Sequence, residues 1–235
     1  MKNALYMEDS YLKEFEAVVE SVNGGKYVIL DKTAFYPRGG GQPHDTGIIN
    51  CNGIDYNVAF TGKFEGKISH EVDKEGLKAG DKITGKISWE RRYKLMRMHT
   101  AAHIIDAVLY TKANALCTGN QLECDKSRID FSLEVIDKDK MQEYIDTANK
   151  CIETDAEVKI YSMPRDEALK IKGIVKLASA MPPEVNDLRI VEIPNIDLQA
   201  DGGTHVKKLK EIGKINLASV ENKGKNNRRL YFTLK

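Results

Sequence analysis

The chain has 235 residues and a formal net charge of +1, from 36 basic and 35 acidic side chains. Its content of 30% charged and 41% hydrophobic residues is ordinary for a globular protein and argues against disorder. No apolar run approaches the roughly 18 residues of a membrane span, and residues 1–15 mix acids and bases where a signal peptide would be apolar. We therefore expect a cytoplasmic protein with no membrane partner.

The cysteines point to the same compartment. Cys51, Cys117, Cys124 and Cys151 form no Cys-x-x-Cys pair, and they are too sparse for a disulfide scaffold. We expect reduced thiols that pack as small hydrophobic side chains.

Basic residues gather toward the C-terminus. Residues 1–88 have a net charge of −2 and residues 89–235 a net charge of +3, while residues 204–235 hold nine basic and two acidic side chains. A segment of this kind can bind phosphate groups. It can equally form the solvated rim of a hairpin, so charge alone leaves both interpretations open.

Short predicted strands separated by glycine-rich turns fill residues 1–88. Asn23-Gly24-Gly25 and Cys51-Asn52-Gly53 are typical hairpin turns. This pattern predicts a small β-barrel or sandwich. Strands are expected at residues 16–22, 26–31, 47–50, 54–60 and 82–89.

A long helix is predicted at residues 90–112, where the chain has neither Gly nor Pro. Apolar residues recur there at spacings of three and four and mark one buried face. They are Leu95, Met98, Ala102, Ile105 and Leu109. We place a domain boundary just before this helix, which predicts domains at residues 1–88 and 89–235.

The second predicted domain mixes helices and strands without a regular alternation. This indicates an α+β fold with a mostly antiparallel sheet and long helices. A long helix is expected at residues 138–155 and a short one at residues 165–172. Strands are expected at residues 127–135, 156–163, 187–193, 215–221 and 228–234, the last two forming a hairpin.

Two of the five histidines, His99 and His103, stand four residues apart on the long predicted helix. This spacing places both imidazoles on one helix face, one turn apart, where they can share a metal ion. Two partly buried structural histidines would have the same spacing. No Glu follows His99, so the pair is not the His-Glu-x-x-His motif of zinc proteases.

A second candidate element is Asp201-Gly202-Gly203-Thr204-His205. Its two glycines permit a sharp turn and close backbone approach, and Asp201 and His205 bring an oxygen and a nitrogen ligand into one loop. Three histidines with a carboxylate, or three histidines with a water, are both sound ligand sets for Zn²⁺. A glycine turn with a capping aspartate is the structural alternative.

A third element is the run of Gly39, Gly40 and Gly41, with Arg38 before it and Gln42 after it. Such a loop exposes backbone N–H groups beside a cation and an amide, so it can cradle a phosphate or fit under a substrate. A plain barrel turn would look the same. The loop lacks the Lys-Ser/Thr of a nucleotide-binding P-loop.

Together, HTAAH at residues 99–103, DGGTH at 201–205 and FYPRGGGQPHDTG at 35–47 resemble one family. They are similar to the freestanding alanyl-tRNA editing proteins of the AlaX type, in their medium-length class, which are relatives of the alanyl-tRNA synthetase editing domain. TGNQLECDKSRIDF at 118–131 and GKNNRRLYF at 224–232 also fit the family pattern. The resemblance runs from about residue 5 to residue 233.

The resemblance implies an N-terminal barrel like those of translation factors, followed by an α+β editing domain. It implies hydrolysis of the ester that joins a wrong amino acid to alanine tRNA, chiefly serine, with glycine as a second candidate. One zinc ion is implied, with His99, His103 and His205 at ligand positions. Asp201 stands where many relatives have Cys, and Ala102 where many synthetase relatives have Thr. The fourth ligand and the metal's identity therefore stay open.

Further roles follow if the family function holds. The hydroxyls of Thr100 and Thr204 and the turn Gly39–Gln42 are candidates for the serine pocket. A zinc-bound water can supply hydroxide, or zinc can hold the substrate amino group. We expect tRNA phosphates to contact Arg91, Arg92, Lys94, Arg97, Lys207, Lys208, Lys210, Lys223, Lys225, Arg228 and Arg229.

Two other functions compete with this one. A catalytically silent tRNA-binding module would keep the fold but lose the metal ligand at position 201. A metal hydrolase that acts on free aminoacyl esters would need no tRNA. The oligomeric state is open in each case.

Overall fold

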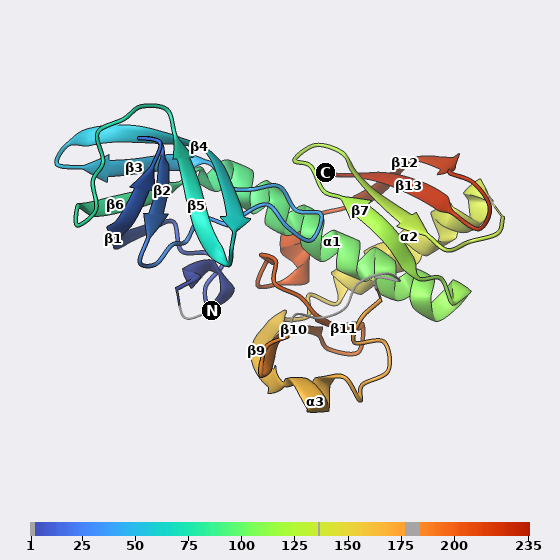
Figure 1. Ribbon diagram of the computed structural model, residues 1–235. Coiled ribbons are helices and arrows are strands. Elements are labelled where there is room, and N and C mark those ends of the chain that lie inside the picture. Colours follow the sequence, from blue (N-terminus) through green and yellow to red (C-terminus); the bar gives the residue numbers. More distant parts are fainter. Residues whose placement is uncertain (1–2, 136, 177–183) are drawn as a thin grey trace. The chain divides into compact units, whose positions relative to one another are not determined.

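Figure 1 shows the computed structural model, which describes residues 3–135, 137–176 and 184–235. The chain divides into two compact units, Met1–Lys94 and Leu95–Lys235. The first unit is built around a closed antiparallel barrel, and the second combines two antiparallel sheets with helices. The predicted α+β class with an N-terminal barrel is confirmed.

Six strands close the barrel in the order β1-β2-β5-β4-β3-β6, and β6 pairs with both β1 and β3. All neighbouring strands are antiparallel. The short 3₁₀ helix η1 (Leu5–Met7) precedes the barrel. The strands are β1 (Glu14–Asn23), β2 (Tyr27–Leu30), β3 (Gly47–Cys51), β4 (Ile54–Phe64), β5 (Lys67–Val72) and β6 (Lys82–Ile87).

Alternation along each strand fills the barrel interior. In β1, Phe15, Ala17 and Val19 are buried, while the residues between them are exposed. Inward side chains of the other strands, such as Val58 and Ile83, complete one core cluster. Burial of a side chain of this size contributes roughly 1.5–3 kcal/mol to stability.

No strand is predicted at β5, because the polar residues Ser69 and His70 interrupt its apolar pattern. Yet His70 is fully buried. Its Nδ1 lies 2.9 Å from the Val28 carbonyl oxygen, and its Nε2 lies 2.9 Å from Oγ1 of Thr33. Both ring nitrogens have hydrogen-bond partners, so burial of this polar ring costs little free energy.

We expect His70 to make the stability of the protein depend on pH. Burial lowers the pKa of His70 from 6.5 to about 4. Between these values the unfolded chain binds a proton that the folded chain does not, so stability falls as the pH decreases. The full effect is about 3 kcal/mol. Urea unfolding of wild type and His70→Gln at pH 7 and pH 4.5 isolates it, and equal pH dependence in both proteins would contradict it.

The second unit contains the helices α1 (Trp89–Ala113, shared with the first unit), α2 (Lys138–Glu153) and α3 (Arg165–Ala168), and the 3₁₀ helix η2 (Leu209–Ile212). Its two sheets have the orders β11-β10-β9 and β12-β13-β8-β7, and their strand pairs are antiparallel. The strands are β7 (Cys117–Gln121), β8 (Ser127–Phe131), β9 (Lys159–Pro164), β10 (Asp187–Ile193), β11 (Asp197–Ala200), β12 (Ile215–Asn222) and β13 (Arg228–Leu234).

Helix positions agree closely with the periodicity of the sequence. Helix α1 begins one residue before the predicted 90–112 and ends one residue after it. Helix α2 begins after Asp137, whose side chain accepts a hydrogen bond from the Lys140 amide and caps the first turn. Strands β7 and β11 are not predicted, because both are short and polar at alternate positions.

The predicted strand at 127–135 is too long, since β8 ends at Phe131. The predicted domain boundary at 88/89 coincides with the start of α1 at Trp89, whereas the division into compact units falls after Lys94. We keep the boundary at 88/89 as a proposal.

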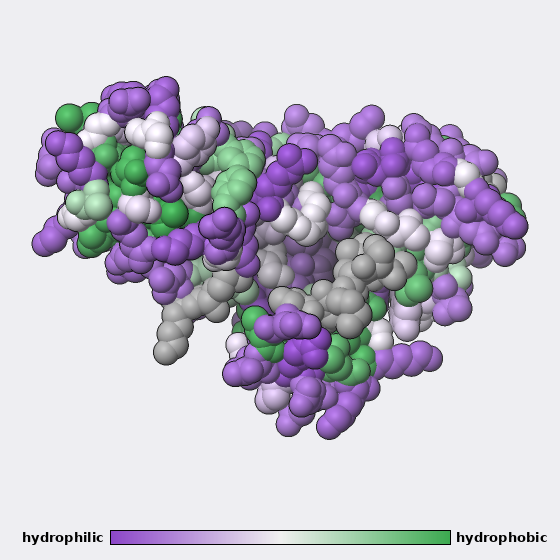
Figure 2. Space-filling view, viewed as in Figure 1, coloured by the Kyte–Doolittle hydropathy of each residue, from purple (hydrophilic) through white to green (hydrophobic). Residues whose placement is uncertain are grey.

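Hydrophilic residues cover much of the face seen in Figure 2, including the region of β12 and β13. No helix among the described residues is long and apolar enough to cross a membrane. All four cysteines are free, as predicted, with Cys51 and Cys117 buried.

Candidate metal centre

Helix α1 and the loop after β11 bring four potential metal ligands together in the second unit. One ligand atom from each of His99, His103, Asp201 and His205 lies within 4.8 Å of the other three. The imidazole centroids are 4.4 Å apart for His99 and His205, 4.7 Å for His103 and His205, and 5.2 Å for His99 and His103. The side chains that the sequence suggests as ligands do converge.

The local structure explains this convergence. His99 and His103 lie one turn apart on the buried face of α1, and 3% and 6% of their surfaces are exposed. His205 is 1% exposed. The carbonyl oxygen of Asp201 accepts a hydrogen bond of 2.8 Å from Nη1 of Arg189, which ties the loop to β10.

Thr100 determines where the His205 ring carries its proton. The Thr100 hydroxyl donates to the Met96 carbonyl oxygen at 3.0 Å, so it has no proton left for Nδ1 of His205, 3.2 Å away. With this hydroxyl orientation the His205 Nδ1–H donates to the hydroxyl oxygen, which also accepts from the Val206 amide. The Nε2 atom of a neutral His205 then carries a lone pair.

A carboxylate orients His103 in a similar way. Nδ1 of His103 lies 2.9 Å from Oδ2 of Asp197, which is buried. Asp197 also accepts hydrogen bonds from the buried ammonium of Lys176 and from Nε2 of Gln199. A histidine that donates Nδ1–H to a carboxylate presents Nε2 to a metal, the usual arrangement around zinc.

The ligand atoms of His99 and His205 lie close to the Asp201 carboxylate at the centre of the cluster. Nε2 of His205 lies 3.0 Å from Oδ2 of Asp201, and Nε2 of His99 lies 3.7 Å from Oδ1 of the same carboxylate. At 3.0 Å, Nε2 of His205 is within hydrogen-bond distance of Oδ2 of Asp201 when that nitrogen carries the ring proton. When the ring proton lies on Nδ1 instead, the two atoms are both acceptors and can share a cation.

The protonation states suit a cation as well. Burial lowers the pKa of His99 well below its ordinary value, and it lowers the pKa of His205 to about 4. Burial raises the pKa of Asp201, but the nearby imidazoles, His99 first, outweigh burial and hold it well below its usual range. Burial also lowers the pKa of His103, but the hydrogen bond and charge of Asp197 raise it above the ordinary value. Metal binding must compete with protons at His103.

Gly203 is required by the packing of the cluster. A Cβ atom at this position would lie 2.1 Å from Cε1 and 2.4 Å from Nδ1 of His99, far inside contact distance. The Gly203 amide also donates to Oδ2 of Asp201 at 2.6 Å. A Cβ at Gly202 would meet nothing within 4 Å. The sequence predicts close backbone approach in this loop, and the structure assigns it to one of the two glycines.

The donor set fits a divalent metal. Ligand atoms of a tetrahedral zinc ion lie about 3.4 Å apart, as follows from bond lengths of about 2.0–2.1 Å. The observed separations of 3.0 Å and 3.7 Å bracket that value. Small shifts of the four side chains would therefore bring their donors to bonding distance of one ion.

Comparison with known proteins identifies the family. The model of tRNA synthetases class II (A) matches residues 4–91, and that of the threonyl and alanyl tRNA synthetase second additional domain matches residues 188–231. The alanyl-tRNA editing protein AlaX-M of Methanosarcina barkeri is 50% identical over 241 residues, which cover 100% of this chain and 99% of that protein. The AlaX-M protein of Saccharolobus solfataricus is 50% identical over 238 residues, with 100% of both chains covered.

The chain belongs to the AlaX-M family of alanyl-tRNA editing proteins. The predicted family is confirmed, and with it the prediction of an enzyme of alanyl-tRNA editing that has tRNA as its partner. The chain is also 37% identical over 222 residues to the alanine–tRNA ligase of Pyrococcus abyssi, covering 92% of this chain but 24% of the ligase.

The glycine turn of this AlaX-M family member lies in the first unit. The backbone amides and carbonyls of Gly39 and Gln42 bond to each other at 2.9 and 3.1 Å and close the turn. Gly40 and Gly41 are exposed, with φ angles of 56° and 80° that favour glycine. The Gln42 side chain is buried. The turn therefore offers backbone groups, rather than the Gln42 amide, to a ligand.

The Thr100 hydroxyl, which we predict to contact the substrate, has protein partners in the structure. Its hydroxyl makes one donor and two acceptor bonds, to Met96, His205 and Val206, and the residue is fully buried. These bonds use the whole hydrogen-bonding capacity of a hydroxyl. Thr100 orients His205 instead. Thr204 is also fully buried.

Two of the arginines that we predict to contact phosphate are buried in the structure. Arg92 is fully buried, donates to both carboxylate oxygens of Asp45 and also bonds to the carbonyl oxygens of Ser10 and Ala34. Arg228 is 8% exposed and is engaged by main-chain carbonyls, including that of Glu134. Both guanidinium groups bond to partners within the fold, so we leave them out of the proposed phosphate contacts.

The other predicted phosphate contacts differ in their surroundings. Arg97 donates to the carbonyl oxygens of Ile212 and Lys235, and Arg229 pairs with Asp130. Arg91 and Lys94 are half-buried. The exposed members of the set are Lys207, Lys208, Lys210, Lys223 and Lys225.

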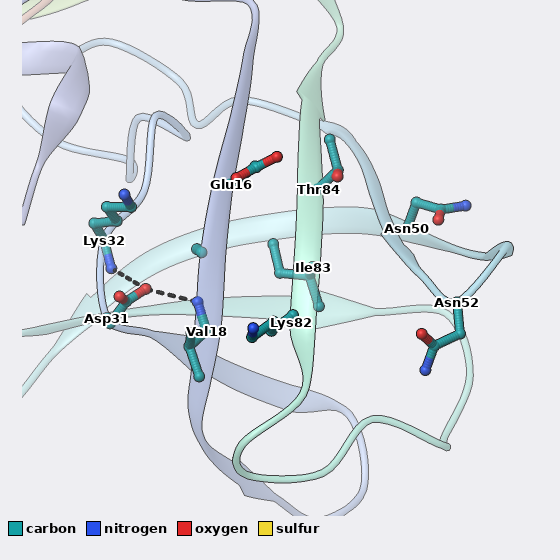
Figure 3. A pocket seen from close by; sticks show the side chains of 10 residues that line it. Glu16, Val18, Asp31, Lys32, Asn50, Asn52, Lys82, Ile83 and Thr84 are labelled. Carbon is teal, nitrogen blue, oxygen red and sulfur yellow. Dashed lines mark hydrogen bonds between the residues drawn. The ribbon is translucent and has the colours of Figure 1, made fainter.

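A surface pocket of about 400 Å³ on the barrel does not belong to this site (Figure 3). Residues of β1 and β6, with Asp31, Lys32, Asn50 and Asn52, line it. The Asp31 carboxylate accepts from the amides of Val18 and Lys32, so one of its oxygens is already satisfied. No predicted site residue lines the pocket.

Proposed function

We propose that this chain hydrolyses the ester of serine mischarged onto alanine tRNA, with zinc bound by His99, His103, His205 and Asp201. The observation that carries the proposal is the buried cluster of three imidazoles and one carboxylate, whose ligand atoms lie within 4.8 Å of one another. Such a cluster is a sound ligand set for Zn²⁺, and the family indicates the reaction. Glycine on alanine tRNA is a second proposed substrate.

Zinc, when bound, acts as a Lewis acid that either lowers the pKa of a water to about 7 or polarises the substrate. The protein's part is to hold the ligands in place. Thr100 and Asp197 fix the Nδ1 protons of His205 and His103, so both Nε2 atoms stay available. An aminoacyl ester is already activated, so an oriented water suffices and no covalent intermediate is needed.

Serine differs from alanine by one hydroxyl. A pocket that hydrogen-bonds this hydroxyl disfavours alanine, because alanine leaves buried polar groups unpaired. We propose that the turn of Gly39, Gly40, Gly41 and Gln42 contributes backbone donors to that recognition, with Thr204 as a second contact. The exposed Gly40 and Gly41 support the first assignment.

We propose that tRNA phosphates contact the basic side chains that remain accessible. They are Arg91, Lys94, Arg97, Lys207, Lys208, Lys210, Lys223, Lys225 and Arg229. Nonspecific phosphate contacts of this kind release counterions, so binding must weaken steeply with salt. We propose a cytoplasmic location as well, which suits a role in translation.

Metal content and hydrolysis measured on one purified sample test the proposal. We expect wild type to contain about one zinc per chain and to deacylate serine-charged alanine tRNA faster than alanine-charged tRNA. The variant His99→Ala loses a ligand and should lose both metal and activity, while Lys112→Ala, an exposed position on the same helix, should keep both. A folded His99→Ala protein that retains metal and activity would disprove the assignment.

The same assay separates the competing functions. Tight tRNA binding without hydrolysis, even after zinc is added back, would identify a silent binding module. Equally fast hydrolysis of a free serine ester would identify a hydrolase that does not need tRNA.

A further inference from the structure

We propose that His44, Phe60 and Phe64, here called the aromatic row, form a stacking surface for an unpaired nucleotide of the tRNA 3′ strand. Arg38 and Arg91 lie beside the row and would contact its phosphates. The inference rests on the proposed function, because an ester at the 3′ end brings single-stranded RNA to the protein. All five residues belong to the first unit.

The three rings follow one another along the outer face of β4. The centroids of the His44 and Phe60 rings are 4.5 Å apart. A Cβ atom at Gly62 would lie 2.6 Å from Cε1 of Phe60 and 2.9 Å from Cε2 of Phe64, so both rings extend over this glycine. No member of the row belongs to the core cluster of the barrel. The row is therefore a surface feature rather than an extension of the core.

Phe64 is the most exposed aromatic side chain among the described residues, with 60% of its surface accessible. Aromatic side chains often cover a glycine in a strand. Contact with Gly62 therefore explains the position of one edge of each phenylalanine ring. It does not account for the open face of Phe64. A flat apolar face in water is the element that single-stranded nucleic-acid-binding proteins use to stack bases.

Two arginines give the row a positive surrounding. Nε of Arg91 donates to the His44 carbonyl oxygen at 3.2 Å. Arg38 is exposed, and its amide donates to the Thr61 carbonyl oxygen at 3.0 Å, which places it next to Gly62 in the barrel wall. Burial first, and then the charges of Arg91 and Arg38, lower the pKa of His44, so its ring is neutral at pH 7.

These features favour RNA over a protein partner. Neighbouring aromatic rings with arginines beside them match a base and its phosphate, and the contact tolerates any base because every base has a π-face. The strand that carries the ester must be held whatever its sequence, so a sequence-tolerant contact suits it. Phe64 contributes the open ring, while Phe60 lies on the other side of Gly62 and packs against His44.

The test measures equilibrium binding to metal-free protein. The probes are a single-stranded RNA that ends in CCA and uncharged alanine tRNA, so the readout needs neither an ester nor a metal. Phe64→Ala should weaken binding by about 5- to 150-fold, the range for loss of one stacked base. Phe64→Tyr should bind as wild type does, because it keeps the ring. Phe64→Leu keeps apolar bulk without a π-face and should bind as weakly as Phe64→Ala.

The matched control is Tyr27→Ala, which removes the other exposed aromatic ring of the barrel, 47% accessible on β2, and should leave binding unchanged. Wild-type affinity in Phe64→Leu or Phe64→Ala would overturn the proposal. A change in sedimentation of Phe64→Ala without a change in RNA affinity would also overturn the proposal, because it would show that a second copy of the chain covers the row. A failure of the hydrolase proposal would appear in the deacylation assay and leave these affinities unaffected.

Discussion

The variant Gly203→Ala should lose its metal and its deacylation activity, although the change adds a single methyl group. The new Cβ would lie 2.1 Å from Cε1 of His99, so the imidazole must move by more than 1 Å to restore van der Waals contact. A displacement of this size at a reactive centre costs about 100-fold in rate. Zinc content, measured by atomic emission after dialysis, and deacylation of serine-charged alanine tRNA check the expectation.

Gly202→Ala is the matched control in the same turn. Its Cβ would meet nothing within 4 Å, so the variant should keep metal, activity and stability to within about 0.5 kcal/mol. If both variants lost metal and activity alike, close packing of Gly203 against His99 would not be the cause of that loss. If Gly203→Ala kept its zinc, His99 would not be a ligand in the proposed position.

Much of the metal centre follows from local spacing. His99 and His103 are four residues apart on a helix with an uninterrupted apolar face, and this fixes their common direction. The loop of Gly202 and Gly203 signals a sharp turn that carries His205. Neither segment alone reveals that the two meet, because they lie roughly 100 residues apart in the chain. Only the resemblance to editing proteins predicts that they form one site.

The side chains that orient the ligands could not be predicted in this way. Asp197 lies in a segment that reads as a loop, and Lys176 precedes it by 21 residues without any motif. Thr100 is a helical threonine whose hydroxyl could serve the substrate, the backbone or a neighbour. Only the fold shows that it bonds to His205.

Arg92 illustrates the same limit for charged residues. A run of basic residues at a helix start suggests phosphate binding, and its neighbours Arg91 and Lys94 remain accessible in part. Arg92, however, points into the first unit and pairs with Asp45, 47 residues earlier. A buried arginine needs such a partner, but sequence does not reveal which member of a basic run has one.

Asp197→Leu should weaken zinc binding by about 10- to 100-fold, the usual cost of removing a partner that orients a ligand. His103 loses the acceptor for Nδ1–H, so its ring is free to rotate or to place its proton on Nε2. The variant should also be less stable by about 3–5 kcal/mol, because it leaves the Lys176 ammonium buried without its counter-charge. Competition against a zinc chelator gives the affinity, and urea unfolding gives the stability.

A second substitution separates these two effects. In Asp197→Leu with Lys176→Met, no buried ammonium remains, so we expect most of the stability to return while zinc affinity stays low. Lys176→Met alone should be less stable but should keep its zinc affinity, since the Asp197 carboxylate still orients His103. Recovery of zinc affinity in the double variant would mean that Asp197 acts only through the stability of the fold. Asp197 acts on His103 and not on the ester. The zinc affinities therefore test the role of Asp197 even in a protein that hydrolyses no ester.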